Sequence, residues 1–167
     1  MKIQKLIVCI LVALCSGCTA VSYQSSGIRG GYSERSLSEH SFRVRYSGNG
    51  SVTLEKSIDF VMLRSAIIAK NNGAKIFTSS NFKTEVNKVD LGTPGVYAFK
   101  PMVYVTVNLT QDYDQTRMAS CVRFSPLFQL SALAKKSVEH IHDTHKCIEE
   151  IKNKYKLTDQ QIESKKQ

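Results

Sequence analysis

The sequence predicts an α+β fold, in which a mainly antiparallel sheet carries one central amphipathic helix and a long C-terminal helix packed on one face. Segments 42–46 and 103–109 alternate apolar and polar residues, which is the period of a strand with one buried side. Segment 53–72 instead repeats its apolar residues at helical spacing. Because strands flank this helix and a second helical segment ends the domain, the order of elements favours α+β.

The N-terminal residues have the three parts of a secretory signal. Lys2 and Lys5 precede an apolar run over residues 6–14, and small residues then lead to Cys18. A transmembrane helix needs roughly 20 residues, so this shorter run favours a signal peptide over residues 1–17 that is cleaved rather than retained.

The end of this signal, Ser16-Gly17-Cys18, resembles a bacterial lipobox. The resemblance implies that Cys18 receives a diacylglyceryl group and that its amine is acylated after cleavage, which gives stable membrane anchoring. An ordinary signal peptide with cleavage nearby is the alternative. Thr19 follows rather than Asp, and by resemblance to lipoprotein sorting in Gram-negative bacteria this implies the outer membrane, on its periplasmic face.

After the signal, the chain has the size of one domain with its own core. Polar residues 18–29 predict a flexible tether, residues 30–156 a single domain and residues 157–167 a polar tail that frays. Removing the two lysines of the signal lowers the formal net charge from +9 to +7, which suits anionic lipid, an acidic polymer or nucleic acid. Tryptophan is absent and the aromatic residues follow strand patterns, so we expect no nucleic-acid partner.

Turn and capping signals place the elements in order. The strand 42–46 precedes the helix 53–72, whose first amides Ser51 or Thr53 can cap, and Gly73 suits the end of that helix. The remaining elements are a strand at 74–77 that resumes at 82–86, a loop at 88–95, a strand at 96–109 with a bulge or an edge at Pro101, a strand at 118–124 and a long helix at 126–155.

Two cysteines, Cys121 and Cys147, remain once the signal has left and Cys18 is acylated. An even pair in the oxidising periplasm predicts a disulfide between them, which would stabilise the fold by about 3–4 kcal/mol. The alternative is two separate thiols, one on a strand and one on a helix, since sequence does not show their geometry.

Candidate metal ligands lie on the predicted C-terminal helix, in the histidine-rich stretch from His140 to His145. His142, His145 and Glu149 would share one helix face at a spacing that suits zinc or copper. The competing interpretation is the exposed face of a mixed-charge helix, because a structural metal site takes four ligands. We therefore expect no metal, no cofactor beyond the lipid on Cys18 and no catalytic residue.

Five different short motifs are spread along the first half of the chain. They are Gly30-Gly31-Tyr32-Ser33-Glu34, Phe42-Arg43-Val44, Gly48-Asn49, Asp59-Phe60 and Leu63-Arg64-Ser65-Ala66. Over residues 27–80 this resembles an uncharacterised family of proteobacterial envelope lipoproteins typified by Caulobacter members, which implies a lipoprotein signal and no assigned activity. The second half departs from the family, which has a Gly-rich insertion after the second strand and a short ending. Within the motifs, Glu34 and Arg64 are expected to form a structural ion pair.

Together these features predict a non-enzymatic lipoprotein of the outer membrane, a module for envelope structure or assembly that binds protein partners. The strand at 103–109, by edge pairing, and the C-terminal helix, by docking, are the expected partner surfaces. The alternatives are a metal-binding or enzymatic protein that uses the helix at 140–145, and a module that binds peptidoglycan or anionic lipid. The oligomeric state stays open.

Overall fold

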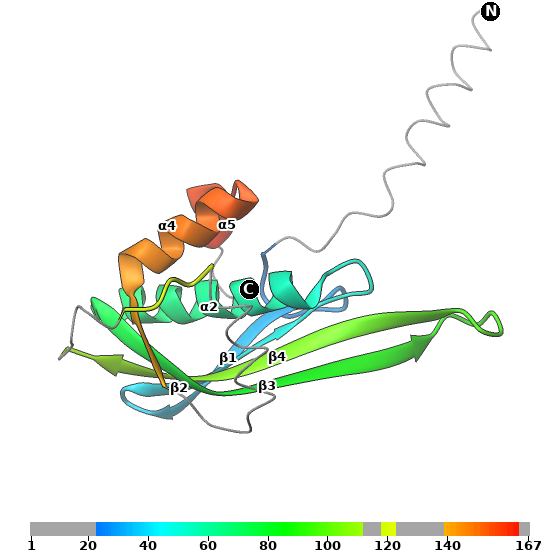
Figure 1. Cartoon of the computed structure of the whole chain (residues 1–167), viewed down its shortest axis with the longest axis horizontal. Helices are drawn as coiled ribbons and strands as arrows, with labels where there is room; N and C mark the ends of the chain where they lie inside the picture. Colours follow the sequence, from blue (N-terminus) through cyan, green and yellow to red (C-terminus); the bar gives the residue numbers. More distant parts are fainter. Residues whose placement is uncertain (1–22, 112–117, 123–138, 164–167) are drawn as a thin grey trace, which may run out of the picture.

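The computed structural model describes residues 23–111, 118–122 and 139–163, which form a twisted sheet with helices on one face (Figure 1). The described strands are β1 (Gly31–Ser38), β2 (Ser41–Ser47), β3 (Ile76–Asp90), β4 (Tyr97–Thr110) and β5 (His140–Asp143). They pair antiparallel in the order β1-β2-β4-β3-β5. The prediction of an α+β fold with an antiparallel sheet is therefore confirmed.

Helix α2 (Leu54–Asn71) packs on the sheet and corresponds to the predicted helix at 53–72. The Thr53 hydroxyl caps it by accepting from the Lys56 amide at 3.1 Å, and Gly73 follows its end with a φ of +70° that suits glycine. Its sheet-facing side meets the inward valines of β4, while the alternate residues of β4 turn to the opposite face.

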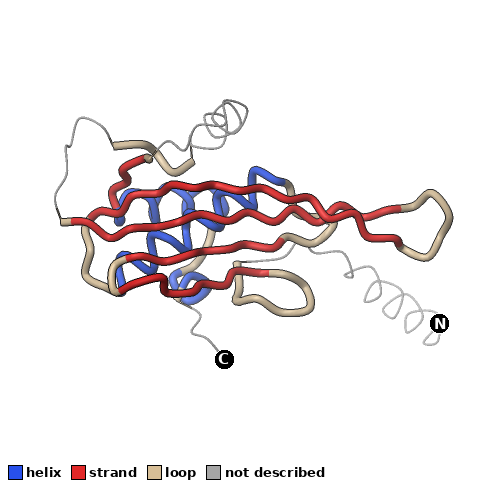
Figure 2. Tube along the Cα trace, turned by 90° about the horizontal axis from the view of Figure 1, so that it is seen from below, coloured by secondary structure: helices blue, strands red, loops and turns tan. Residues whose placement is uncertain are grey.

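The helices form two layers above the sheet. Helix α4 (Thr144–Tyr155) packs on α2 rather than on the sheet, and the short α5 (Asp159–Ile162) follows it (Figure 1). No helix among the described residues is long and apolar enough to cross a membrane. The view from below shows the strands in front of the helices, so none of the described helices covers the outer face of the sheet (Figure 2).

The prediction of one long helix over 126–155 is wrong in its described part. Residues His140–Asp143 form the strand β5 beside β3, and the helix starts at Thr144. Asp143 causes this start, because its side chain accepts from the Lys146 amide at 2.8 Å and so caps the helix. Residues 126–138 lie outside the described residues.

The predicted strand at 118–124 is also not observed as a strand. Met118 forms a single bridge with Ile141, and residues 119–122 continue without regular pairing. Residues 123–124 lie outside the described part of the chain.

Both ends of the domain are more ordered than the tether and tail predictions imply. Tyr23 is buried, and its ring stacks on Tyr32 with centroids 4.8 Å apart, so packing begins within the predicted tether at 18–29. In the predicted tail, Thr158 caps α5 and Ile162 is buried. An aromatic contact and a buried isoleucine therefore extend the domain beyond residues 30–156.

Strand β4 does not offer a partner edge over 103–109, because β2 and β3 pair with it on both sides there. Beyond Met102, toward Tyr97, however, β4 is paired on one side only among the described strands. Pairing of β2 with β4 ends at Met102, whereas β3 and β4 stay paired as far as Asp90 and Tyr97. This two-stranded hairpin, residues 86–100, projects past the rest of the sheet and is called the arm (Figures 1 and 2). Pro101 lies at its base, where its carbonyl accepts from the Gly48 amide at 2.8 Å just after the end of β2.

The central packing predicts a large difference between two phenylalanines. Phe60 of α2 is 1 % exposed and contacts the rings of Tyr23, Tyr46 and Tyr155, whereas Phe99 on the arm is 58 % exposed. Phe60→Ala should lower the free energy of unfolding by about 3–5 kcal/mol. Phe99→Ala should change it by less than about 0.5 kcal/mol. Urea unfolding followed by circular dichroism measures both, and equal losses would contradict this account of the core.

Candidate functional site

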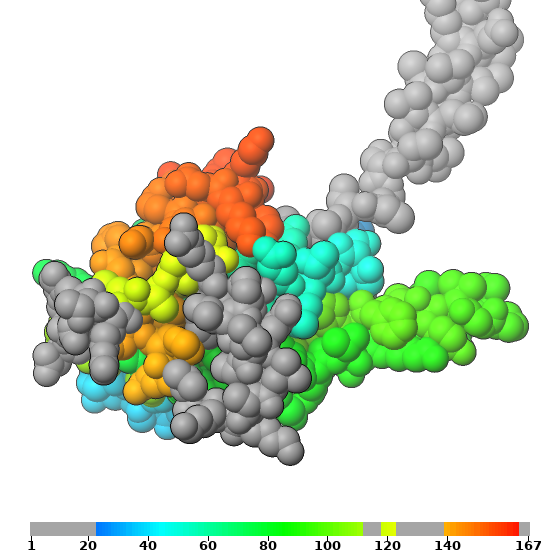
Figure 3. Space-filling model, in the orientation of Figure 1, coloured from blue at the N-terminus to red at the C-terminus, as the bar shows by residue number. Residues whose placement is uncertain are grey.

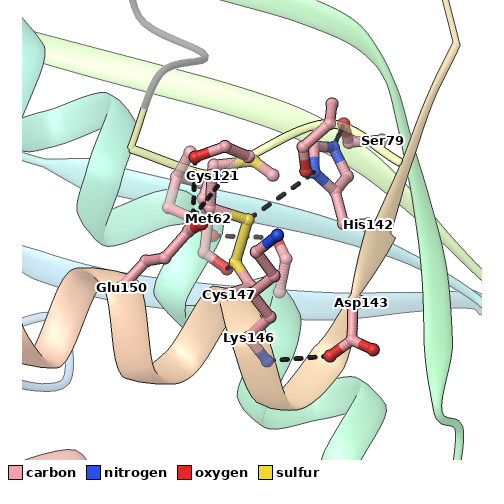
Figure 4. Close-up of a disulfide and its surroundings, with 12 residues drawn as sticks. Met62, Ser79, Cys121, His142, Asp143, Lys146, Cys147 and Glu150 are labelled. Carbon is pink, nitrogen blue, oxygen red and sulfur yellow. Dashed lines mark hydrogen bonds between the residues drawn. A yellow bond between two sulfur atoms is a disulfide. The ribbon is translucent and has the colours of Figure 1, made fainter. Parts of the chain in front are cut away.

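The two cysteines of the predicted disulfide are joined. Cys121 and Cys147 form a buried disulfide with an S–S distance of 2.04 Å, which ties the segment 118–122 to α4 (Figure 4). Glu150 of α4 reinforces this link, because its carboxylate accepts from the Cys121 amide at 2.9 Å and from the Ser120 hydroxyl at 2.8 Å. The disulfide therefore holds together segments that regular pairing does not join.

His142 of β5 lies beside the disulfide (Figure 4) and is fully buried. Its Nδ1 lies 3.0 Å from the Ala119 carbonyl, and its Nε2 lies 2.7 Å from the Ser79 hydroxyl. The carbonyl can accept but not donate, so Nδ1 carries the proton and the Ser79 hydroxyl donates to Nε2. Burial lowers the pKa of His142 to about 4, so the ring is neutral at pH 7.

This serine–histidine pair has the separation of a nucleophile and its base, but both side chains have no exposed surface. A substrate cannot reach Ser79 in this arrangement. The pair instead joins β3 to β5, and the Phe77 ring stacks on His142 at 5.0 Å. A structural role for His142 follows from these contacts.

The metal candidates are not brought to one helix face. His142 points inward from β5, whereas His145 and Glu149 are exposed on α4, where Glu149 lies 3.8 Å from Lys152. Their expected common face depended on a helix through residue 142, which the strand β5 replaces. Within the described ranges, no cluster of three or more histidine, cysteine, aspartate or glutamate side chains could hold a metal ion.

The predicted ion pair between Glu34 and Arg64 is present. The Arg64 guanidinium donates to both carboxylate oxygens, at 2.7 and 3.1 Å, and also lies over the Tyr32 ring at 4.4 Å. It ties β1 to α2 and therefore belongs to the framework rather than to a reactive site.

Apolar side chains gather on the arm. Seven large apolar residues are exposed within the described ranges, and five of them lie on the arm: Val86, Leu91, Val96, Tyr97 and Phe99. Val86, Tyr97 and Phe99 continue the side of the sheet that α2 covers in the body, because they alternate in step with the buried valines of β4. In the space-filling view the arm stands clear of the body (green, Figure 3).

Basic side chains gather on the outer face of the sheet. Arg35, Arg43 and Arg45 are neighbours on β1 and β2 and line a hollow of about 550 Å³ with Lys83 and Glu85. Glu85 is paired with Lys83 at 2.6 Å, and none of the three arginines has a carboxylate partner within the described residues. Arg35 and Arg43 lie directly opposite each other, an arrangement that like charges disfavour in the absence of an anion.

Comparison with protein-family models, with curated proteins and with solved structures finds no match to the chain. The resemblance to envelope lipoproteins over residues 27–80 therefore stays a prediction. The arm and the basic outer face are features that the sequence analysis did not identify, and their function has to be argued from their geometry.

The enclosed His142 predicts a pH dependence of stability. Its pKa is about 4 in the folded protein and about 6.5 in the unfolded chain, so between these values the unfolded state binds the extra proton. The free energy of unfolding should therefore be highest above pH 6.5 and fall by about 3 kcal/mol as the pH drops to 4. Urea titrations across this range should show this loss in the wild type. In His142→Gln the loss should be much smaller, because only the contributions of other titrating groups remain.

The matched control is His145→Gln, since His145 is exposed on α4. This variant should keep the wild-type slope. A slope that is the same in the His142 and His145 variants would contradict the assignment of the pH dependence to the enclosed ring.

Proposed function

We propose that this protein is a lipid-anchored protein of the bacterial outer membrane, facing the periplasm, that binds another envelope protein and performs no enzymatic step. Two independent features support export. The first is the lipobox-like sequence that ends at Cys18. The second is the disulfide between Cys121 and Cys147, because disulfides persist in oxidising compartments such as the periplasm.

The observation that carries the binding role is the apolar arm. An apolar sheet surface that lacks a covering helix loses the stabilisation that burial gives, and a two-stranded hairpin is marginal by itself. Exposed apolar patches of this kind mark interaction sites. A partner that covers Val86, Tyr97 and Phe99 would therefore complete the layer that α2 provides in the body.

Charge favours a protein over a bilayer as the occupant of the arm. Lys88 and Asp90 lie on the same side as the apolar residues, and the Lys88 ammonium sits 3.4 Å from the centre of the Tyr97 ring. Burying Asp90 in hydrocarbon would cost on the order of 3 kcal/mol, whereas a protein can supply a basic partner for it. No described strand pairs with the outer edges of the arm, and such edges suit strand pairing with a protein.

The anchor predicts a labelling result in cells. Labelled palmitate should be incorporated into the wild-type chain and should be lost in Cys18→Ser, because the modified thiol is absent. Cys15→Ser, in the signal itself, is the matched control and should keep the label. Membrane fractionation should place the labelled chain in the outer membrane, and an unlabelled wild type would contradict the lipoprotein assignment.

The arm predicts a contact that can be trapped in place. A photo-crosslinking residue at Asn87 should give one discrete adduct in cells, whereas the same residue at Ser36 on β1 should give none. Adding Phe99→Ser should weaken the adduct by roughly 30-fold, the effect expected for an aromatic anchor worth about 2 kcal/mol. Leu37→Ser, which removes an exposed apolar side chain outside the arm, should leave it unchanged.

Two outcomes would contradict this role of the arm. Equal adducts from Asn87 and Ser36 would show that the arm has no special partner. An adduct of twice the mass of the mature, lipid-bearing chain would show that the arm binds a second copy of the same chain instead.

A further inference from the structure

We propose that the bilayer that holds the lipid also binds the domain directly, through anionic phospholipid headgroups at a surface made by Ile28, Arg29, Arg45 and Lys100, here called the basic turn. This inference builds on the proposed lipid anchor. It adds a second contact, which would fix the orientation of the domain on the membrane.

The first argument is the length of chain between the lipid and the domain. Four residues, 19–22, separate Cys18 from Tyr23, and Tyr23 is buried against Tyr32. Five residue steps span at most about 18 Å when fully extended. An acylated Cys18 would therefore hold the start of the folded domain within about 18 Å of the headgroups, so one side of the domain has to face them.

The second argument is the shape of the segment that follows Tyr23. Gly27 and Gly30 exchange two backbone hydrogen bonds of 3.1 and 3.0 Å, which places Ile28 and Arg29 at the tip of a tight turn. Gly30 has a φ of +97°, and a Cβ there would lie 2.3 Å from the Ser47 carbonyl oxygen, so the turn is held closely against β2. The Ile28 side chain at its tip is completely exposed.

The third argument is charge. Arg29, Arg45 and Lys100 line a hollow of about 250 Å³ beside the turn, and none of the described residues that line it is acidic. The Nε of Arg45, a side chain that lines the hollow, is buried and finds no hydrogen-bond acceptor among the described residues. Phosphate oxygens suit guanidinium groups because they accept several hydrogen bonds at once.

A bilayer fits this surface better than a protein does. An apolar tip surrounded by positive charges alone matches an interface in which the hydrocarbon takes Ile28 and the anionic headgroups take Arg29 and Lys100. The arm differs in charge, since it carries Asp90 among its apolar residues.

The test uses the mature chain with Cys18→Ser, exported through an ordinary cleavable signal, so that no acyl chain contributes. It should sediment with vesicles of phosphatidylethanolamine and phosphatidylglycerol and much less with vesicles of phosphatidylcholine alone. Arg29→Gln and Lys100→Gln should each weaken binding about fivefold, since one basic residue near an anionic surface contributes about 1 kcal/mol. Ile28→Ser should weaken it about tenfold.

The matched controls are Arg35→Gln and Leu37→Ser, a basic and an exposed apolar residue away from the turn. Both should bind as the parent chain does. Equal losses in the controls would overturn the proposal, because binding would then not depend on the basic turn. An absence of binding to the anionic vesicles would also overturn it. Palmitate labelling reports on the anchor separately, so failure of the anchor and failure of this surface are distinguishable.

A second measurement checks orientation in the acylated protein reconstituted in the anionic vesicles. A polarity-sensitive fluorophore attached at Ile28→Cys should show a blue-shifted emission, whereas the same dye at Leu37→Cys should report water. The native cysteines do not compete for the dye, because Cys121 and Cys147 are joined and Cys18 is acylated. Identical spectra at the two positions would overturn the proposal.

Discussion

The burial of α2 on two sides is the constraint on which the rest of the structure depends. The helix packs on the sheet through one side and meets α4 through another, and this accounts for the twelve buried residues among its eighteen. One of them is Asp59, whose carboxylate accepts from Lys154 and from the Tyr155 hydroxyl, both at 2.6 Å. Burial is the main cause that raises the pKa of Asp59, so these donors of α4 are what makes the buried carboxylate tolerable.

This dependence explains why several strong contacts hold β5 and α4 in place. Helix α4 has to stay against α2, yet it is short, and the strand before it pairs with β3 over four residues. The disulfide from Cys147 to Cys121, the Glu150 contacts and the enclosed His142 all lie at this point. In the chain-entropy model the disulfide contributes about 3–4 kcal/mol, which is a large share of the stability of a small domain.

The features that the sequence predicted correctly depend on signals within one short segment or on a small number of possible residue pairs. Helix α2 shows its cap, its period and its final glycine within one segment, and the disulfide had only two cysteines left to join. The strand β5 was missed because residues 140–143 gain their partners from β3, more than sixty positions earlier in the chain, and local periodicity contains nothing of this pairing. The arm was missed for the same reason, since it exists only because β2 stops at Ser47 while β4 continues.

Lys100 connects the two proposed surfaces. It belongs to the arm, near Phe99, and it also lines the hollow beside the Gly27–Gly30 turn. At the opposite end of the same hairpin, β3 is held by β5 through Ser79 and His142. A bilayer that fixes the basic turn would therefore fix the base of the arm as well, and because the hairpin is continuous with the sheet, the arm could not swing freely. The apolar side of the arm would then face one direction relative to the membrane. Its partners would be limited to proteins that present a matching surface at the same distance from the bilayer.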